Sequence, residues 1–470
     1  MLPASNNEWG LCEGPSPARK VAWHSHPHTA IVHPVTSRPA PSPGPRLPAW
    51  AGRNFQLLTA SALISGLGNS GVTIASAFAV LQAGGSGTDI GLVAAARTLP
   101  LVVFLLIGGA LADRLPRHRV MVGANLLNAA SQAAFAALVL SGSAAVWQMA
   151  ALSAVGGTAQ AFFYPANEGM VMATVEREHA GRAFTVYRMG VNGANIGGAG
   201  LAGGLIAAFG PGWVLALDAA SFALAALLRA FLRIGDLPRP ERGGGLLRDL
   251  RDGWREFASR RWLWTIVVQF SVVNAVTAAS LAVYGPLVAD AHLGGAGPWG
   301  IALAASGLGT VAGGFLMLRW RPRRILLAGT LCIFPQVVPL VALAAAAPAW
   351  LVIAVMLAEG VAMEVFGVTW MLALHQEIPE DKLSRVVAYD ILGSVSLVPL
   401  GTALAGPAAD AFGVSYALLG CAGLTVLLTG AVLFVPEVRG LTRTKAPRAV
   451  PQPTLNAPSG GSGDGTAAVS

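Results

Sequence analysis

The chain has 470 residues, of which 54% are hydrophobic and only 11% are charged. Soluble proteins average about 25% charged residues, so a soluble fold of this length would lack the polar side chains needed to cover its surface. The formal net charge of +8 invites a nucleic-acid partner, but the arginines cluster between long apolar segments. That placement is typical of a protein oriented in a lipid bilayer, and it argues against nucleic acid as a partner.

The few cysteines and lysines argue against a metal-binding or disulfide-rich protein and against an ATP-driven one. Cys12, Cys332 and Cys421 are too widely spaced for a metal-ligand pattern or a disulfide framework. None of the three lysines follows a glycine, so the chain has no phosphate-binding Walker A loop. We therefore expect no metal, no cofactor and no ATP-driven mechanism within this chain.

The N-terminal segment, residues 1–52, contains ten prolines and four of the eight histidines. His24, His26, His28 and His33 could in principle bind a metal. A polar, proline-rich tail offers no fixed ligand geometry, so the sequence favours a disordered cytoplasmic tail instead.

Twelve apolar segments follow, and each is long enough to cross a hydrocarbon core of ~30 Å as a helix. Six lie within residues 53–234 and six within 262–435. They cover about 55–81, 88–113, 118–140, 144–173, 180–209, 212–232, 262–289, 298–318, 324–346, 349–376, 383–411 and 414–435.

Two polar segments complete the chain. In the linker 235–261, an apolar helical face lies opposite arginines; it comprises Leu246, Leu247, Leu250, Trp254 and Phe257. This pattern predicts an amphipathic helix at the cytoplasmic membrane surface. The last segment, 436–470, is rich in Gly, Ser and Pro, and we expect a disordered cytoplasmic tail.

The charges of the connecting loops give the orientation. Loops after even-numbered segments contain Arg or Lys, whereas loops after odd-numbered segments contain none near their ends. By the positive-inside rule, both termini are predicted to be cytoplasmic.

The two sets of six segments match each other at an offset of 203 residues. Matching positions include Trp147 with Trp350, Arg182 with Arg385, and the triplets 208–210 and 411–413, which both read Ala-Phe-Gly. The sequence therefore predicts an all-α membrane protein with twelve transmembrane helices in two pseudo-symmetric six-helix halves.

The turn between the second and third segments resembles motif A of the major facilitator superfamily (MFS). Gly109 is followed by Asp113-Arg114 and by the basic residues Arg117 and Arg119, with Pro116 where many members have glycine. The run 162–166 (Phe-Phe-Tyr-Pro-Ala), with Glu178 and Arg182 after it, resembles the branch of bacterial siderophore and macrolide exporters. The resemblance covers about residues 53–436.

The resemblance implies alternating access driven by an ion gradient, usually of protons, with outward flux of a drug or siderophore. It also implies that Asp113 forms a contact between the halves at the cytoplasmic gate, supported by Gly109, Arg114, Arg117 and Arg119. Two departures concern the coupling mechanism. Gly198 is followed by Ala199 where the antiporter motif has Gly-Pro, and Gln160 stands nearest to the position of an arginine in the fourth span.

Among the ionisable residues within the predicted spans, five are candidates for proton coupling or substrate binding: Arg97, Asp218, Glu359, Glu364 and Asp390. A charge at the bilayer centre costs at least ~2.5–3.5 kcal/mol, so such residues tend to be functional or paired. Glu359 is our preferred proton carrier, because the tenth span lines the central cavity in the family. Its alternative role is a paired structural carboxylate. Asp390, nearer the cytoplasmic end, is a further candidate, and a hydrated side chain without a role is its alternative.

The fifth span carries glycines at helical spacing on one face: Gly190, Gly193, Gly197, Gly200 and Gly204. Such a stripe predicts the close approach of another helix.

The sequence thus predicts a secondary active transporter, not an enzyme, that exports a small organic molecule in exchange for protons. We expect a monomer in the bilayer of a bacterial cell membrane. A proton-coupled uptake transporter and a non-transporting scaffold or receptor are alternatives. A membrane enzyme using Glu359 or His375 is a weaker one, because no nucleophile or metal-ligand grouping accompanies them.

Overall fold

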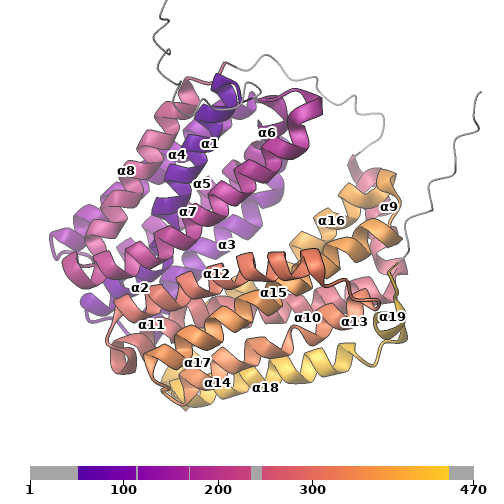
Figure 1. Ribbon diagram of the computed structural model, residues 1–470. Helices are drawn as coiled ribbons and strands as arrows, with labels where there is room; N and C mark the ends of the chain where they lie inside the picture. The colour runs from indigo at the N-terminus through magenta and orange to yellow at the C-terminus, as the bar shows by residue number, and fades with distance from the viewer. Residues whose placement is uncertain (1–50, 113–114, 169, 234–245, 444–470) are drawn as a thin grey trace, which may run out of the picture. The chain divides into compact units, whose positions relative to one another are not determined.

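The computed structural model describes residues 51–112, 115–168, 170–233 and 246–443. Within them the chain is helical, apart from an isolated bridge between Arg324 and Thr442. Figure 1 shows the order of the helices, with the N-terminal helices in indigo to pink and the C-terminal ones in orange to yellow. The N-terminal part contains α1 (Arg53–Asn69), α2 (Val72–Gln82), α3 (Gly87–Ala112), α4 (Arg117–Leu140), α5 (Val146–Glu168), α6 (Met170–Ala173), α7 (Ala180–Phe209) and α8 (Pro211–Ala230).

The C-terminal part contains more interruptions. Its elements are α10 (Arg261–Ala279), α11 (Gly285–Val288), α12 (Ala296–Arg319), α13 (Ile325–Leu331), α14 (Val337–Ala344), α15 (Ala349–Glu377), α16 (Glu380–Val395), α17 (Val398–Phe412), α18 (Val414–Val432) and the short α19 (Pro436–Gly440). Two π-helical turns, Ser280–Tyr284 and Ala289–Leu293, flank α11. Helix α19 occupies the start of the segment that the sequence predicts as a disordered tail, so that prediction is wrong for these first residues.

Several predicted spans are two helices in succession. Ser70 and Gly71 separate α1 from α2, a 3-10 turn with Pro335 separates α13 from α14, and Pro399 lies in the first turn of α17. Proline has no N–H to donate to the preceding turn, which explains the last two breaks.

Ten stretches of the described residues are long and apolar enough to cross a membrane. The two remaining spans of the predicted twelve are α5 and α7. Helix α7 has 30 residues, but its glycines, Asn192 and Asn195 reduce its hydropathy. A 20-residue helix such as α8 spans about 30 Å at 1.5 Å per residue, which matches the hydrocarbon core.

The internal repeat extends to backbone conformation. Gly210 ends α7 with φ 88° and ψ 165°, and Gly413 ends α17 with φ 84° and ψ 148°. These two glycines are 203 residues apart, and both have a conformation that side chains other than glycine's rarely tolerate. Every described residue with φ between +20° and +160° lies in a loop that the sequence places outside. These outer loops are therefore tight turns.

Exposed aromatic side chains mark the ends of the spans in the same register. At the predicted outer ends, Trp147 and Trp350 are 70% and 69% exposed, and Phe209 and Phe412 are 66% and 70% exposed. At the opposite ends, Phe231 and Phe434 form a further pair. Aromatic side chains concentrate at the two membrane–water interfaces, so these pairs define the boundaries of the apolar region.

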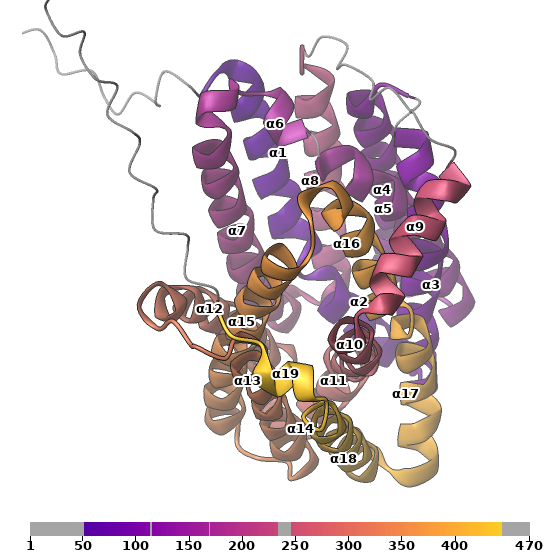
Figure 2. The same ribbon diagram turned by 90° about the vertical axis from the view of Figure 1, so that its right-hand side faces the viewer.

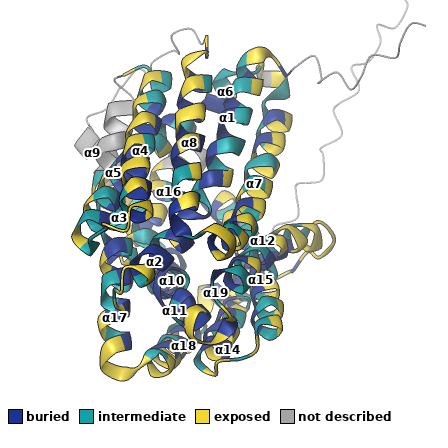
Figure 3. Ribbon diagram, turned by 90° about the vertical axis from the view of Figure 1, so that its left-hand side faces the viewer, coloured by how far each residue is buried: buried dark blue, intermediate teal, exposed yellow. Residues whose placement is uncertain are grey.

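Buried side chains form three hydrophobic clusters. The largest contains residues of both halves, for example Phe78 and Leu215 from the first and Tyr284 and Leu418 from the second. The other two clusters lie nearer the predicted cytoplasmic ends and each belongs to one half. The halves thus share a core towards one side only, and Figure 3 shows the distribution of buried and exposed residues along the helices.

The predicted amphipathic helix is present as α9 (Leu246–Ser259). It packs against α16, as Figure 2 shows, with Phe257 buried and its ring 6.1 Å from that of Tyr389. Trp254 is 53% exposed but also contacts Tyr389. Near its C-terminal end, the apolar face of α9 therefore packs partly against the protein, through Phe257, and is partly exposed, at Trp254.

Candidate functional site

The two halves meet through two pairs of helices, α3 with α17 and α7 with α12. In the first pair, a methyl group at Gly406 would collide with backbone atoms of Gly87 and Thr88. In the second pair, the same addition at Gly203 would lie 2.8 Å from the Cα of Gly300. All these residues are near the predicted outer ends of their helices, so glycine packing brings the halves together there.

A polar contact reinforces this closure. The Thr88 hydroxyl on α3 donates a hydrogen bond to Asp410 Oδ2 on α17, with 2.5 Å between the oxygens. Deeper along the same pair of helices, the hydroxyl oxygens of Thr98 and Thr402 are 3.5 Å apart.

A cavity of about 240 Å³ lies between the halves below this closure. Helices α2, α3 and α5 line it from the first half, and α10, the first π-helical turn and α17 line it from the second. Its polar side chains are Thr73, Ser76, Arg97, Thr98, Ser153 and Thr402, and the other lining residues are apolar.

Arg97 is held in this cavity wall by a small polar cluster that the sequence analysis did not identify. Its Nη2 donates to Asn69 Oδ1 at 2.9 Å, and Gln160 Nε2 donates to the same oxygen at 3.0 Å. Gly157 on α5 packs directly against the Arg97 backbone carbonyl, where a methyl group would not fit. Amphipathic periodicity does not predict such a cluster, because Asn69 and Gln160 lie on helices that meet only in the folded protein.

Asp218, which the sequence also singled out, lies outside the cavity wall. Its side chain on α8 is fully buried beside Gln132 and Ser221, and neither carboxylate oxygen has a hydrogen bond of standard geometry in the described residues. Its charge acts on Arg97. Arg97 and Asp218, the two candidate residues of the first half, therefore interact electrostatically.

The two glutamates of α15 face different surroundings. The Ser306 hydroxyl on α12 donates to Glu359 Oε2 at 3.0 Å, so this carboxyl group lies between α12 and α15 and not in the cavity wall. Glu364 lies against Gly313 and Gly314 of α12, where the charge of Arg188 on α7 acts on it. Arg188 belongs to the other half and was not among the candidates from the sequence.

For Asp390, the alternative of a hydrated side chain is wrong. It is 9% exposed, Trp370 Nε1 donates to its Oδ2 at 3.0 Å, and Ser394 donates to its Oδ1 at 3.4 Å. The error arises because depth along the span was used alone, whereas the neighbouring helix α15 covers this side chain.

The prediction of a close approach at the glycine stripe of α7 holds at Gly190, where an added methyl group would lie 2.9 Å from Leu63 of α1, and is wrong for other members. Additional methyl groups at Gly193 and Gly204 would meet nothing within 4 Å, and the one at Gly200 would make an ordinary contact at 3.4 Å. The closest approaches to backbone occur instead at Gly198, against α1, and at Gly203, against α12. Both lie outside the stripe, so the closest backbone contacts of α7 are made by glycines that the spacing did not single out.

Comparisons with known proteins agree with this arrangement. The family model described as Major Facilitator Superfamily matches residues 58–394. The chain belongs to this superfamily. It is 30% identical over 422 residues to the multidrug efflux pump Tap of Mycolicibacterium fortuitum, covering 83% of this chain and 98% of that protein. It is 26% identical over 388 residues to the MFS-type transporter YfiS of Bacillus subtilis (strain 168), covering 80% and 91%.

Solved structures of MFS transporters have the same fold. The nucleoside transporter NupG superposes with a TM-score of 0.65 at 14% identity, covering 81% of this chain and 98% of that one. A bacterial homologue of the human lysosomal transporter Spinster gives 0.60 at 14% identity, covering 84% and 98%. The protein is therefore a multi-pass membrane transporter with the MFS fold of twelve transmembrane helices in two halves.

The segment that resembles motif A falls partly outside the described residues. Gly109 lies near the end of α3, Arg117 begins α4, and Arg119 is exposed in the first turn of α4. Asp113 and Arg114 lie outside the described ranges, as do the four histidines of the N-terminal tail. The gating role of Asp113 stays a prediction.

Proposed function

We propose that the protein is an exporter of small organic molecules that works by alternating access in exchange for protons. The observation that carries this proposal is the similarity to an efflux pump over 98% of that pump's length. Export is the direction that the relative's name states, and we extend it to this chain.

The packing of the two halves supports alternating access. They share a hydrophobic core and glycine contacts near the predicted outer ends, whereas their cores nearer the predicted cytoplasmic ends are separate. Rocking of one half against the other around a cavity at their interface is the usual mechanism of such repeats. In this state the cavity would open towards the cytoplasm, where an exporter collects its substrate.

Glu359 is the proton carrier in this proposal. It is an acidic side chain midway along a membrane-spanning helix, where the charged form is costly. Ser306, its hydrogen-bond donor, belongs to the helix α12 that contacts α7 of the other half. A change in the α7–α12 contact would therefore alter the surroundings of this carboxyl group.

The test uses everted membrane vesicles, whose lumen corresponds to the cell exterior and is acidified by respiration. Two xanthene dyes of opposite charge, sulforhodamine B and rhodamine 6G, are supplied outside. An exporter that exchanges substrate for protons should accumulate at least one dye in the lumen, and nigericin, which collapses the pH gradient, should abolish the accumulation. Vesicles that accumulate neither dye, or accumulate dye equally after nigericin treatment, would contradict proton-driven export of such molecules.

A further inference from the structure

The charged side chain that lines the cavity between the halves is positive. Arg97 is the cavity's only ionisable lining residue, and the other polar groups are the hydroxyls of Thr73, Ser76, Thr98, Ser153 and Thr402. Guanidinium groups donate hydrogen bonds only, and hydroxyls can donate as well as accept. Thr98 and Thr402 already donate to backbone carbonyls of their own helices. The lining therefore offers a positive charge with the hydroxyls of Thr73, Ser76 and Ser153 as further donors, and it contains no carboxylate.

The Arg97 guanidinium is held in place by a hydrogen bond, but most of its N–H donors have no acceptor in the described residues. Within the described ranges its only hydrogen bond is that from Nη2 to Asn69 Oδ1, and Asn69 is itself fixed by Gln160. The bonding partner is a neutral amide, so this contact orients the guanidinium and leaves its charge in place. The remaining donors are available to a molecule in the cavity.

Asp218 does not occupy those donors. Both of its carboxylate oxygens lack a hydrogen-bond partner in the described residues, so the two side chains are not directly bonded. Asp218 acts on Arg97 only as a nearby charge behind the cavity wall. The lining itself therefore has a formal charge of +1.

The size of the cavity limits what it holds. At about 240 Å³ it is smaller than the ~300–1,000 Å³ of sites that enclose a drug-sized ligand. It accommodates one substituted ring or one acidic group of a larger molecule. The apolar side chains around Arg97, such as Ile90 and Leu281, suit the non-polar part of that group.

We propose that this cavity binds an anionic group, such as a carboxylate or sulfonate, of an otherwise apolar organic molecule. Arg97 binds the anion through charge-assisted hydrogen bonds, and the hydroxyls of Thr73, Ser76 and Ser153, which donate to no group in the described residues, complete the donor set. The proposal rests on the proposed transport function and specifies the substrate class at that site: organic acids rather than organic cations.

Binding is measured on the purified protein in detergent, with no gradient, as the shift in melting temperature at increasing probe concentration. The probes are benzenesulfonate and phenyltrimethylammonium, which share a ring and differ in the sign of their charge. A molecule that binds only the folded protein stabilises it by RT ln(1 + L/Kd), where L is its free concentration, so the melting temperature rises as the probe is added. We expect benzenesulfonate to stabilise the wild type and phenyltrimethylammonium to have no comparable effect.

Arg97→Gln should weaken benzenesulfonate binding about tenfold or more, because a charged donor is lost, while Arg97→Lys should retain part of the affinity. Arg188→Gln is the matched control, since it removes an exposed arginine of α7 that does not line the cavity. If Arg97→Gln fails to fold, the comparison of the two probes on the wild type and on Arg97→Lys still tests the anion site. Equal or stronger stabilisation by the cation, or no stabilisation by benzenesulfonate, would overturn the proposal.

The outcomes for the site and for transport are separable. Dye accumulation in everted vesicles with a preference for rhodamine 6G would leave export standing and would contradict the anion site. Benzenesulfonate binding that depends on Arg97, without accumulation of either dye, would support the site and contradict proton-driven export.

Discussion

Two fully buried ionisable side chains of α8, Asp218 and Arg229, show how differently a charge can be accommodated. Arg229 lies over the ring of Phe163, with 4.6 Å from Cζ to the ring centroid, whereas Asp218 has no such contact. Neither has a hydrogen-bond partner in the described residues. A cation is attracted by an aromatic face, but a carboxylate is not. Asp218 has instead the more distant charge of Arg97 and the neighbouring side chains of Gln132 and Ser221.

At the same scale, we predict that Glu359→Gln uncouples transport from protons. Glutamine can still accept a hydrogen bond from Ser306, so packing between α12 and α15 should be retained. Dye flux driven by an imposed pH gradient should fall at least tenfold, while exchange of dye down its own gradient should persist. Proteoliposomes with and without the pH gradient give both measurements.

Glu364→Gln is the comparison variant, because Glu364 lies beside Gly314 and Arg188 instead of Ser306. Its effect on gradient-driven flux should be smaller. Gradient-driven flux at the wild-type level in Glu359→Gln would remove Glu359 from the coupling mechanism.

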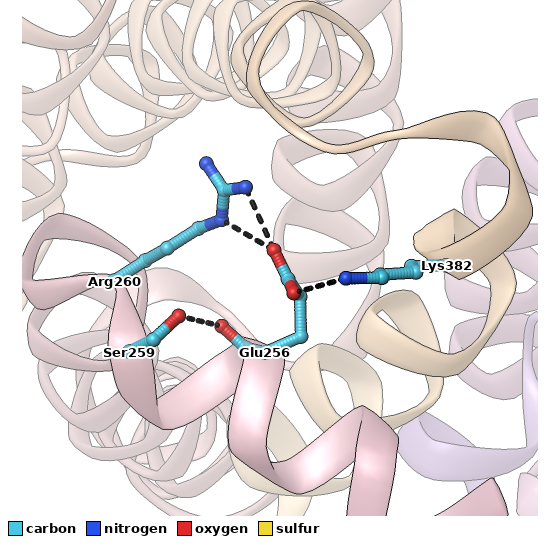
Figure 4. A network of polar contacts seen from close by, with 4 residues as sticks. All are labelled: Glu256, Ser259, Arg260 and Lys382. Carbon is cyan, nitrogen blue, oxygen red and sulfur yellow. Dashed lines mark hydrogen bonds and ion pairs between the residues drawn. The ribbon is translucent and has the colours of Figure 1, made fainter.

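Among the elements, α9 is the one that joins the two halves along the sequence while docking on the second. Figure 4 shows Glu256 of α9 between two basic groups. Arg260 Nη2 lies 2.8 Å from Glu256 Oε1, and Lys382 Nζ of α16 lies 2.9 Å from Glu256 Oε2. The hydrogen bonds from Lys382 and then from Arg260 lower the pKa of Glu256 below its ordinary value. The docked helix therefore favours the ionised carboxylate.

The docking of α9 should weaken in acid. A carboxyl group whose pKa is lowered on docking contributes its full stabilisation above its ordinary pKa of 4.5, and loses it as the pH falls through the lower docked value. Exposed ion pairs each contribute roughly 0.2–1 kcal/mol, so loss of the pair with Lys382 should raise the undocked fraction by up to about fivefold.

Spin labels at the exposed positions Ala258 and Ala388 report this docking as a distance distribution between α9 and α16. We expect broadening below pH 4.5 in the wild type, and at neutral pH in Glu256→Gln. A distribution in Glu256→Gln that matches the wild type would show that Phe257 and Tyr389 hold the helix without the ion pairs.

The contact between α3 and α17 gives a prediction about the conformational equilibrium. A methyl group in Gly406→Ala would meet the backbone of Gly87 and Thr88, so the predicted outer ends should separate. The variant should favour an outward-open state, because a destabilised closed state is less populated. Ser76→Cys in the cavity should then react several-fold faster with a maleimide added from outside.

Gly423→Ala on α18 is the control, since its added methyl group meets nothing within 4 Å. Both substitutions raise helix propensity, so only a steric effect should distinguish them. Equal labelling rates in the two variants would mean that the close approach at Gly406 does not control the outer closure.

For the whole molecule, hydrophobic length, loop charge and the internal repeat were sufficient to predict the fold class. The same patterns identified the turns at Gly210 and Gly413 through a shared Ala-Phe-Gly run. They did not reveal that α16 and α17 are separate helices, because hydropathy is insensitive to a local break at Ser396 and Leu397.

The candidate site was predictable only in part. An arginine within a span is conspicuous, so Arg97 could be identified as a candidate. Its partner Asn69 and the hydroxyls of Thr98 and Thr402 are ordinary residues of polar-containing helices, and only the packing of the halves assembles them. For Asp390, the position along the predicted span suggested a hydrated side chain. Its partner Trp370 lies on another helix, so the sequence did not reveal that contact.

The orientation in the membrane is our last prediction. In a background with all three cysteines replaced by serine, Ala83→Cys and His292→Cys should react with an impermeant maleimide added to intact cells. Arg119→Cys and Arg321→Cys should react only after permeabilisation. All four positions are exposed in the structure, so burial does not confound the comparison. The reverse pattern would invert the assignment of both termini to the cytoplasm.

The tight turns at Gly210 and Gly413, predicted to lie outside, have a consequence for biosynthesis. Since the turn at Gly210 connects α7 to α8 directly, and the turn at Gly413 connects α17 to α18, each pair of helices can enter the bilayer as a hairpin. Little polar backbone and no lysine or arginine then has to be carried across the hydrocarbon region with the turn. A longer or basic insertion at these turns would burden the translocation machinery even if the finished protein could accommodate it.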